Sequence, residues 1–131
     1  MNSITIIVPV TVKAKLTDKL RAHLVEEASA VAEQMELEIK QINIQMQREL
    51  ERAPEHEEEI RNFFDNEAGK RQAQLQEALH RKETFEKLAP GAEILQGKSE
   101  RQVELKIGDN IRDAMGVEIL VEDDKIIAIR S

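Results

Sequence analysis

The sequence predicts an α+β fold in which a long antiparallel helical hairpin, of coiled-coil type, is inserted into a small antiparallel β-sheet or barrel. Three observations lead to this prediction. Apolar residues alternate at the start of the chain, two long stretches with helical periodicity lie on either side of a proline, and alternation returns after residue 90. We therefore expect residues 1–16 and 90–131 to form a β domain and residues 17–89 to form the hairpin.

The N-terminal strand is marked by apolar residues at every second position. These are Ile4, Ile6, Val8, Val10 and Val12. A period of two is typical of a strand that buries one face. Pro9 has no N–H group to donate to a neighbouring strand, so we expect this strand to lie at a sheet edge or to bulge there.

The first helix is expected to begin at Thr17 or Asp18, which are both good N-cap residue types. Apolar residues then recur in steps of four, four and three, an 11-residue repeat that keeps them on one face of a nearly straight helix. They are Leu20, Leu24, Ala28, Val31, Met35, Ile39, Ile42, Met46, Leu50 and Ala53.

A tight reversal is expected at Ala53 and Pro54, because proline disfavours helix in the residue before it and suits the first turn of a new helix. The second helix should end before Pro90. Its sparser apolar stripe consists of Ile60, Phe64, Ala68, Leu75, Leu79 and Phe85. Each arm has about 35 residues and a length of roughly 50 Å, so the chain returns to the level at which it left the first strand.

Four short strands are expected in the C-terminal part, at residues 93–96, 102–107, 117–122 and 125–130. Turn residues separate them, namely Gly97, Gly108 and the pair Asp123 and Asp124 between two apolar runs. With the N-terminal strand they would form a small sheet or barrel.

The composition argues against several classes of function. A net charge of −7 disfavours nucleic acid and anionic membranes as partners, because both reward clustered positive charge. Cysteine is absent, which excludes thiol chemistry and Cys-ligated metals. The phosphate-binding glycine motifs and the nucleophile-elbow serine motif are also missing. We therefore expect a non-enzymatic protein that holds no cofactor. No signal-peptide pattern and no apolar run long enough to span a bilayer are seen, so we expect it to be cytoplasmic.

One pattern is similar to a metal site. Glu77 and His80 have the Glu-x-x-His spacing of di-iron bundles, and His23 with Glu26 or Glu27 would lie nearby across the hairpin. At 100° per residue, however, Glu77 and His80 point away from the apolar stripe of their helix. A solvated face explains them better, and we expect no metal.

Three residues of the first helix predict an interaction surface. Leu37 and Ile44, with Ala30 one heptad earlier, lie about 150° from the apolar stripe on a helical wheel, so the second helix cannot cover them. The hairpin's own contact is also narrow for the number of residues it orders. Both points favour a homo-oligomer, most simply a dimer, over the alternative that these are ordinary exposed apolar residues.

The tip of the hairpin is strongly acidic. It carries Glu55, Glu57, Glu58 and Glu59. These residues could dock a basic partner protein. The alternative is that they stabilise the positive end of the second helix and keep the tip soluble.

Several segments resemble the YlqD family of bacterial proteins. They are the strand-to-helix entry at 10–13, the Glu- and Gln-rich hairpin, the run at 105–109 and the run at 115–119. The resemblance covers nearly the whole chain. It implies a bacterial cytoplasmic protein and supplies no catalytic residues, and in some bacteria the family is encoded near ribosome-maturation factors.

Three classes of function fit these features. The first is a structural or protein-interaction protein whose hairpin oligomerises or presents its flank or tip to another protein. The second is a chaperone-like clamp, similar to prefoldins by analogy only. The third is a ribosome-maturation-associated factor, as the resemblance suggests, although the shortage of aromatic residues makes base stacking a poor explanation.

Overall fold

The computed structural model describes all residues, from Met1 to Ser131, and confirms the α+β fold class. Two compact units are present, Met1–Leu20 with Ala89–Ser131, and Arg21–Leu88. In chain order the elements are β1 (Ser3–Lys15), α1 (Asp18–Arg52), the 3₁₀ turn η1 (Pro54–His56), α2 (Glu57–Lys87), β2 (Glu93–Lys106), α3 (Ile111–Ala114), β3 (Glu118–Glu122) and β4 (Lys125–Arg130). The helical hairpin is thus inserted between β1 and β2.

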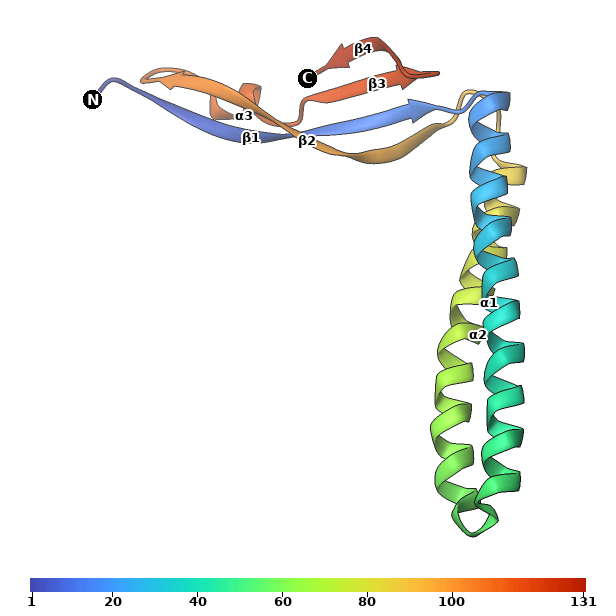
Figure 1. Cartoon of the computed structure of the whole chain (residues 1–131). Helices are drawn as coiled ribbons and strands as arrows, with labels where there is room; N and C mark the ends of the chain where they lie inside the picture. The colour runs from blue at the N-terminus through green and yellow to red at the C-terminus, as the bar shows by residue number, and fades with distance from the viewer. The chain divides into compact units, whose positions relative to one another are not determined.

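The β unit contains one four-stranded sheet with the order β2-β1-β3-β4. The β1–β2 pair is antiparallel over the full length of both strands, and β3–β4 is an antiparallel hairpin (Figure 1). The β1–β3 pair is parallel and spans only Thr11–Ala14. This one parallel pair differs from the wholly antiparallel sheet expected from the sequence. It arises because the chain crosses back through α3 before it enters β3.

Strand β2 is a single long strand, whereas the sequence predicted two strands separated by a turn at Gly97 and Lys98. Gly97 pairs with Val12, and Leu95 pairs with Lys13, so one residue of β2 is left over between them. The glycine therefore marks a β-bulge, a common use of glycine inside a strand. The sheet consequently has four strands instead of five.

One face of β1 contributes to the core of the β unit, as its alternating pattern predicted for Val8 and Val10, whereas Ile4 of the same stripe is 56% exposed. Val8 is 1% exposed and Val10 is 3% exposed. The other buried apolar residues of this unit are Ala14, Leu16, Ala114, Val117 and Leu120. Pro9 lies where β1 has β2 on one side and no strand on the other, because pairing with β3 begins only at Thr11. The missing N–H of the proline is therefore tolerated.

Helices α1 and α2 lie side by side as an antiparallel hairpin, and the chain reverses at Ala53 and Pro54 as predicted (Figure 1). We call their facing surfaces the seam. A buried cluster of Ala32, Leu75 and Ala78 forms part of it, with Met35 and Ile39 packed against the cluster. Neither helix contains an apolar stretch that could cross a membrane.

The seam differs from the predicted stripes at two positions. Val31 is 38% exposed while its neighbour Ala32 is buried, and Leu79 is 40% exposed while Ala78 is fully buried. In both helices the small residue faces the partner helix and the larger one faces solvent. The physical reason is that Leu75 of α2 packs in one cluster with Ala32 and Ala78, and a larger side chain at either alanine would overpack the seam.

Candidate interaction surfaces of the hairpin

The outer face of α1 presents the three residues that the sequence singled out. Leu37 is 49% exposed and Ile44 is 53% exposed, and Ala30 is exposed as well. Seven residues correspond to nearly two full helical turns, so the three side chains form a row along the helix. Buried Ala28 and Met46 lie on the seam side, so α2 does not cover this row.

The four glutamates at the tip are all exposed. Glu57 accepts a hydrogen bond from Arg61 Nε at 3.0 Å, one turn along α2. Glu59 lies 3.7 Å from Nδ1 of His56, while Glu55 and Glu58 form no ion pair. Glu57, Glu58 and Glu59 thus occupy the first turn of α2, where negative charge interacts favourably with the helix dipole, and Glu55 lies just before it in η1.

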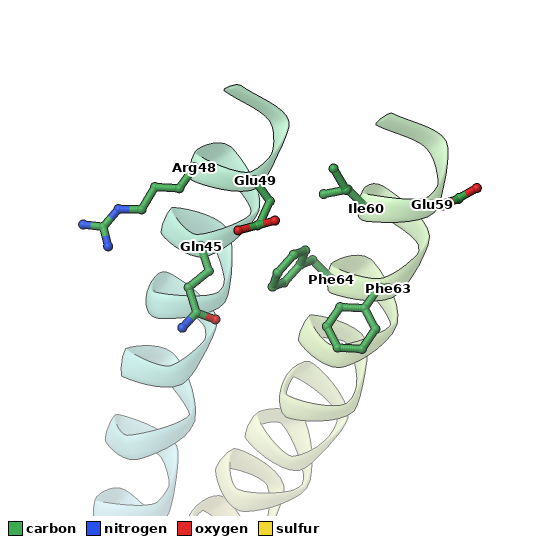
Figure 2. A pocket seen from close by; sticks show the side chains of 7 residues that line it. All are labelled: Gln45, Arg48, Glu49, Glu59, Ile60, Phe63 and Phe64. Carbon is green, nitrogen blue, oxygen red and sulfur yellow. The ribbon is translucent and has the colours of Figure 1, made fainter. Parts of the chain in front are cut away.

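A shallow groove lies beside the tip, on one flank of the hairpin, with a volume of about 540 Å³. Figure 2 shows Phe64 turned toward α1 and Phe63 at the border of the groove. The two rings meet edge to face, with centroids 5.1 Å apart, and Phe63 is 60% exposed. The residues that line the groove are Gln45, Arg48, Glu49, Glu59, Ile60, Phe63 and Phe64. Its exposed ring offers an apolar anchor of the kind that protein interfaces use.

An arginine lies in the apolar stripe of α2. Arg71 Nη1 donates to Glu67 at 2.7 Å, and its Nε lies 3.8 Å from Glu38 of α1. The hydrogen bond from Arg71, followed by that from Lys70, holds the pKa of the Glu67 carboxyl below its ordinary value. This cluster joins the two helices electrostatically near the middle of the seam.

A second ion network crosses the sheet of the β unit. Glu118 of β3 lies 2.8 Å from Lys13 of β1 and 3.3 Å from Arg130 of β4, and Arg130 donates to Glu93 of β2 at 2.6 Å. Every strand therefore contributes one member. The hydrogen bond from Arg130 lowers the pKa of the Glu93 carboxyl, and the same bond raises the pKa of Arg130.

The residues of the metal-like pattern do not converge. His23 Nε2 lies 2.9 Å from Glu27 on its own helix, and both side chains are more than half exposed. His80 and Glu77 are exposed on α2. No three histidine or carboxylate side chains lie close enough together to share an ion.

Comparison with protein families decides where the chain belongs. The family described as "YlqD protein" matches residues 4–130. The chain belongs to the YlqD family. This confirms the resemblance noted in the runs at 105–109 and 115–119, and the match extends over the sheet and the hairpin alike. No curated protein matches the chain.

A solved structure shares the fold of this YlqD-family chain. It is a crystal structure of a protein described as of unknown function from Synechococcus sp. WH 8102, with a TM-score of 0.87 and 23% identity. The alignment covers 98% of this chain and 97% of the other. The likeness therefore includes the hairpin inserted into the sheet, at an identity that shows the fold alone.

Sequence reasoning missed the tip groove and both ion clusters of this YlqD-family chain. Phe63 does not belong to the helical stripe that includes Phe64, and its place beside the groove depends on α1. Arg71 reads as an interruption of the α2 stripe until Glu38 is placed opposite it. One sequence feature could have pointed to the groove. Aromatic residues make up only 2% of the chain, and two of the three phenylalanines are adjacent near the tip.

Proposed function

We propose that this YlqD-family protein is a non-enzymatic interaction protein of the bacterial cytoplasm whose helical hairpin pairs with the hairpin of a second copy. The observation that carries the proposal is the exposed row on α1, in which Leu37 and Ile44 keep about half of their surface in contact with water. Burying such side chains is favourable by roughly 25 cal/mol for each Å² of apolar surface removed from water.

The narrow seam supports the same conclusion. In the hairpin unit, Arg21–Leu88, only five residues are buried, and three of them are alanines. Ordering each residue costs about 1.5 kcal/mol of conformational entropy, which small side chains offset poorly. A second hairpin laid against α1 would complete a four-helix arrangement and add the burial that a lone pair of helices lacks.

The proposal is tested by measuring molar mass with light scattering across a range of micromolar concentrations. We expect a mass approaching twice 15.0 kDa for the natural chain. The double variant Leu37→Glu with Ile44→Glu should have the molar mass of a monomer. Ile107→Glu is the matched control, because Ile107 is 81% exposed but lies in the β unit, and it should leave the dimer intact. A monomeric mass for the natural chain at all concentrations contradicts self-association.

A second candidate function is favoured by the groove beside the tip. Exposed Phe63, which lines the groove with Ile60 and Phe64, could hold an apolar segment of another protein, as a chaperone-like clamp would. In that case the chain should suppress aggregation of an unfolding enzyme, and Phe63→Ser should abolish the suppression. Leu79→Ser is the matched control, since Leu79 is exposed on the same helix outside the groove.

A further inference from the structure

We propose that two copies associate through antiparallel pairing of their α1 helices, with the two-fold axis passing beside Leu37. This inference rests on the self-association proposed above and specifies its orientation and register. It follows from the residues that share the outer face of α1 with the exposed apolar row.

That face continues over most of the helix. Starting at His23, residues in steps of three and four stay on the side opposite the seam, and every one of them is exposed. They are His23, Glu26, Ala30, Glu33, Leu37, Gln41, Ile44, Arg48 and Glu51. The face runs for about 42 Å at 1.5 Å per residue, which is long enough for a helix–helix interface.

The side chains along this face complement those of a second copy that runs in the opposite direction. When α1 is laid antiparallel on a second α1 with Leu37 facing Leu37 of the second copy, Ala30 faces Ile44, so a small side chain meets a large one. Ridges into grooves of this kind are what close helix packing requires. Because the pairing is two-fold symmetric, each such contact occurs twice.

The charges are complementary in the same register. Glu26 faces Arg48 of the second copy, Glu33 faces the neutral Gln41, and His23 faces Glu51. Arg48 forms no ion pair within the chain, and neither do Glu26, Glu33 and Glu51. These groups are therefore available to a partner, which is the arrangement that electrostatic complementarity across an interface requires.

Parallel pairing does not share this property. It would place each charged residue of the face against its own equivalent, so Glu26 would meet Glu26 and Arg48 would meet Arg48. Like charges that lie directly opposite each other oppose association. The charge pattern thus selects the antiparallel orientation.

Cysteine cross-linking tests the orientation cleanly, because the natural chain contains no cysteine. The variants Ala30→Cys, Leu37→Cys and Ile44→Cys are each treated with a short bis-maleimide and separated by denaturing electrophoresis. We expect Leu37→Cys alone to form a covalent dimer. In the antiparallel register, residue 30 and residue 30 of the second copy would be about 21 Å apart along the helices, and the same holds for residue 44. Ala30→Cys and Ile44→Cys should therefore not cross-link when each is present alone. A mixture of the two variants should cross-link, because residue 30 of one copy faces residue 44 of the other.

The outcomes separate the two proposals. Covalent dimers from all three single variants would mean parallel pairing, which overturns this inference and leaves self-association standing. A dimeric mass without any cross-link at residue 37 would overturn the register. A monomeric mass without cross-links would remove both proposals.

Charge reversal provides an independent test. Arg48→Glu and Glu26→Arg should each raise the dissociation constant of the dimer at least about tenfold, because two attractive contacts become repulsive in each dimer. The double variant should return it to within about threefold of the natural value. All these positions are exposed, so circular dichroism should show unchanged helix content. A double variant no tighter than either single variant would contradict the pairing of these two residues.

Discussion

Arg21, near the start of the hairpin unit, donates a hydrogen bond from Nη2 to the carbonyl oxygen of Leu88, at its end, over 2.6 Å. Its Nη1 also donates to the carbonyl oxygen of Glu86 at 3.2 Å and to that of Phe85. The last carbonyl groups of a helix have no partner within the helix. One guanidinium therefore satisfies the open end of α2 and joins the two arms of the hairpin at its base.

Removal of this guanidinium should loosen the base of the hairpin. We expect Arg21→Ala to lower the free energy of unfolding by about 2 kcal/mol, since hydrogen bonds from a charged group are worth more than neutral ones. Arg21→Lys should recover part of the loss, because lysine keeps the charge but not the fork of donors. Urea denaturation followed by circular dichroism measures both. Arg81→Ala is the control, because Arg81 is exposed and forms no ion pair, and a similar loss there would refute the role of Arg21.

The two leucines of α2 should differ in their importance for stability. Leu75 is 7% exposed and packs against Ala32 and Ala78, whereas Leu79 is 40% exposed. We expect Leu75→Ala to cost about 3 kcal/mol and Leu79→Ala less than about 1 kcal/mol. The midpoints of urea unfolding give the comparison directly. Equal losses of stability would contradict the placement of Leu75 in the seam and of Leu79 outside it.

The sheet should lose stability on acidification through Glu93. Its pKa in the folded chain lies below the ordinary value of 4.5 because Arg130 donates to its carboxylate. A depressed folded pKa means that the contribution to stability is present above the unfolded pKa and disappears as the pH falls through the folded value. Glu93→Gln should therefore flatten the dependence of the unfolding midpoint on pH below about 4.5. A ¹³C NMR titration of the carboxyl group that gave a pKa above 4.5 would contradict this prediction.

The β3–β4 turn should accept glycine. Asp123 and Asp124 both have positive φ angles, 46° and 69°. Residues other than glycine adopt such backbone angles at a cost in free energy. We expect Asp124→Gly to raise the free energy of unfolding by about 0.5 kcal/mol. Asp113→Gly makes the same chemical change within α3, where φ is negative, and should be destabilising instead. Thermal unfolding of the two variants shows whether their effects have opposite signs.

The sequence predicted the large features of this fold because local patterns determine them. The alternation in β1, the break at Pro54 and the two helical stretches need no knowledge of distant residues. The ends of α1 and α2 and the insertion of the hairpin between strands followed from these features alone.

Details that depend on a partner element could not be read in the same way. A periodic stripe does not decide whether Val31 or Ala32 faces the seam, because α2 makes that choice. Gly97 is compatible with a turn and with a bulge, and only its pairing with Val12 distinguishes them. The contacts of Arg21 join residues more than 60 positions apart, so the residues near Arg21 in the sequence do not predict them. The exposed row of Ala30, Leu37 and Ile44 could be predicted from the periodicity of one helix. The groove near Phe63 could not, because residues of both helices line it.

The two parts of β1 have unequal partners and should therefore exchange their amide protons at different rates. Between Thr11 and Ala14 it is flanked by strands on both sides, while from Ser3 to Pro9 it belongs to a ribbon of only two strands. Two-stranded ribbons are marginally stable alone. In deuterated solvent, amide protons of the first half should therefore be replaced long before those of the second, and fraying of this unit should begin at the N-terminus.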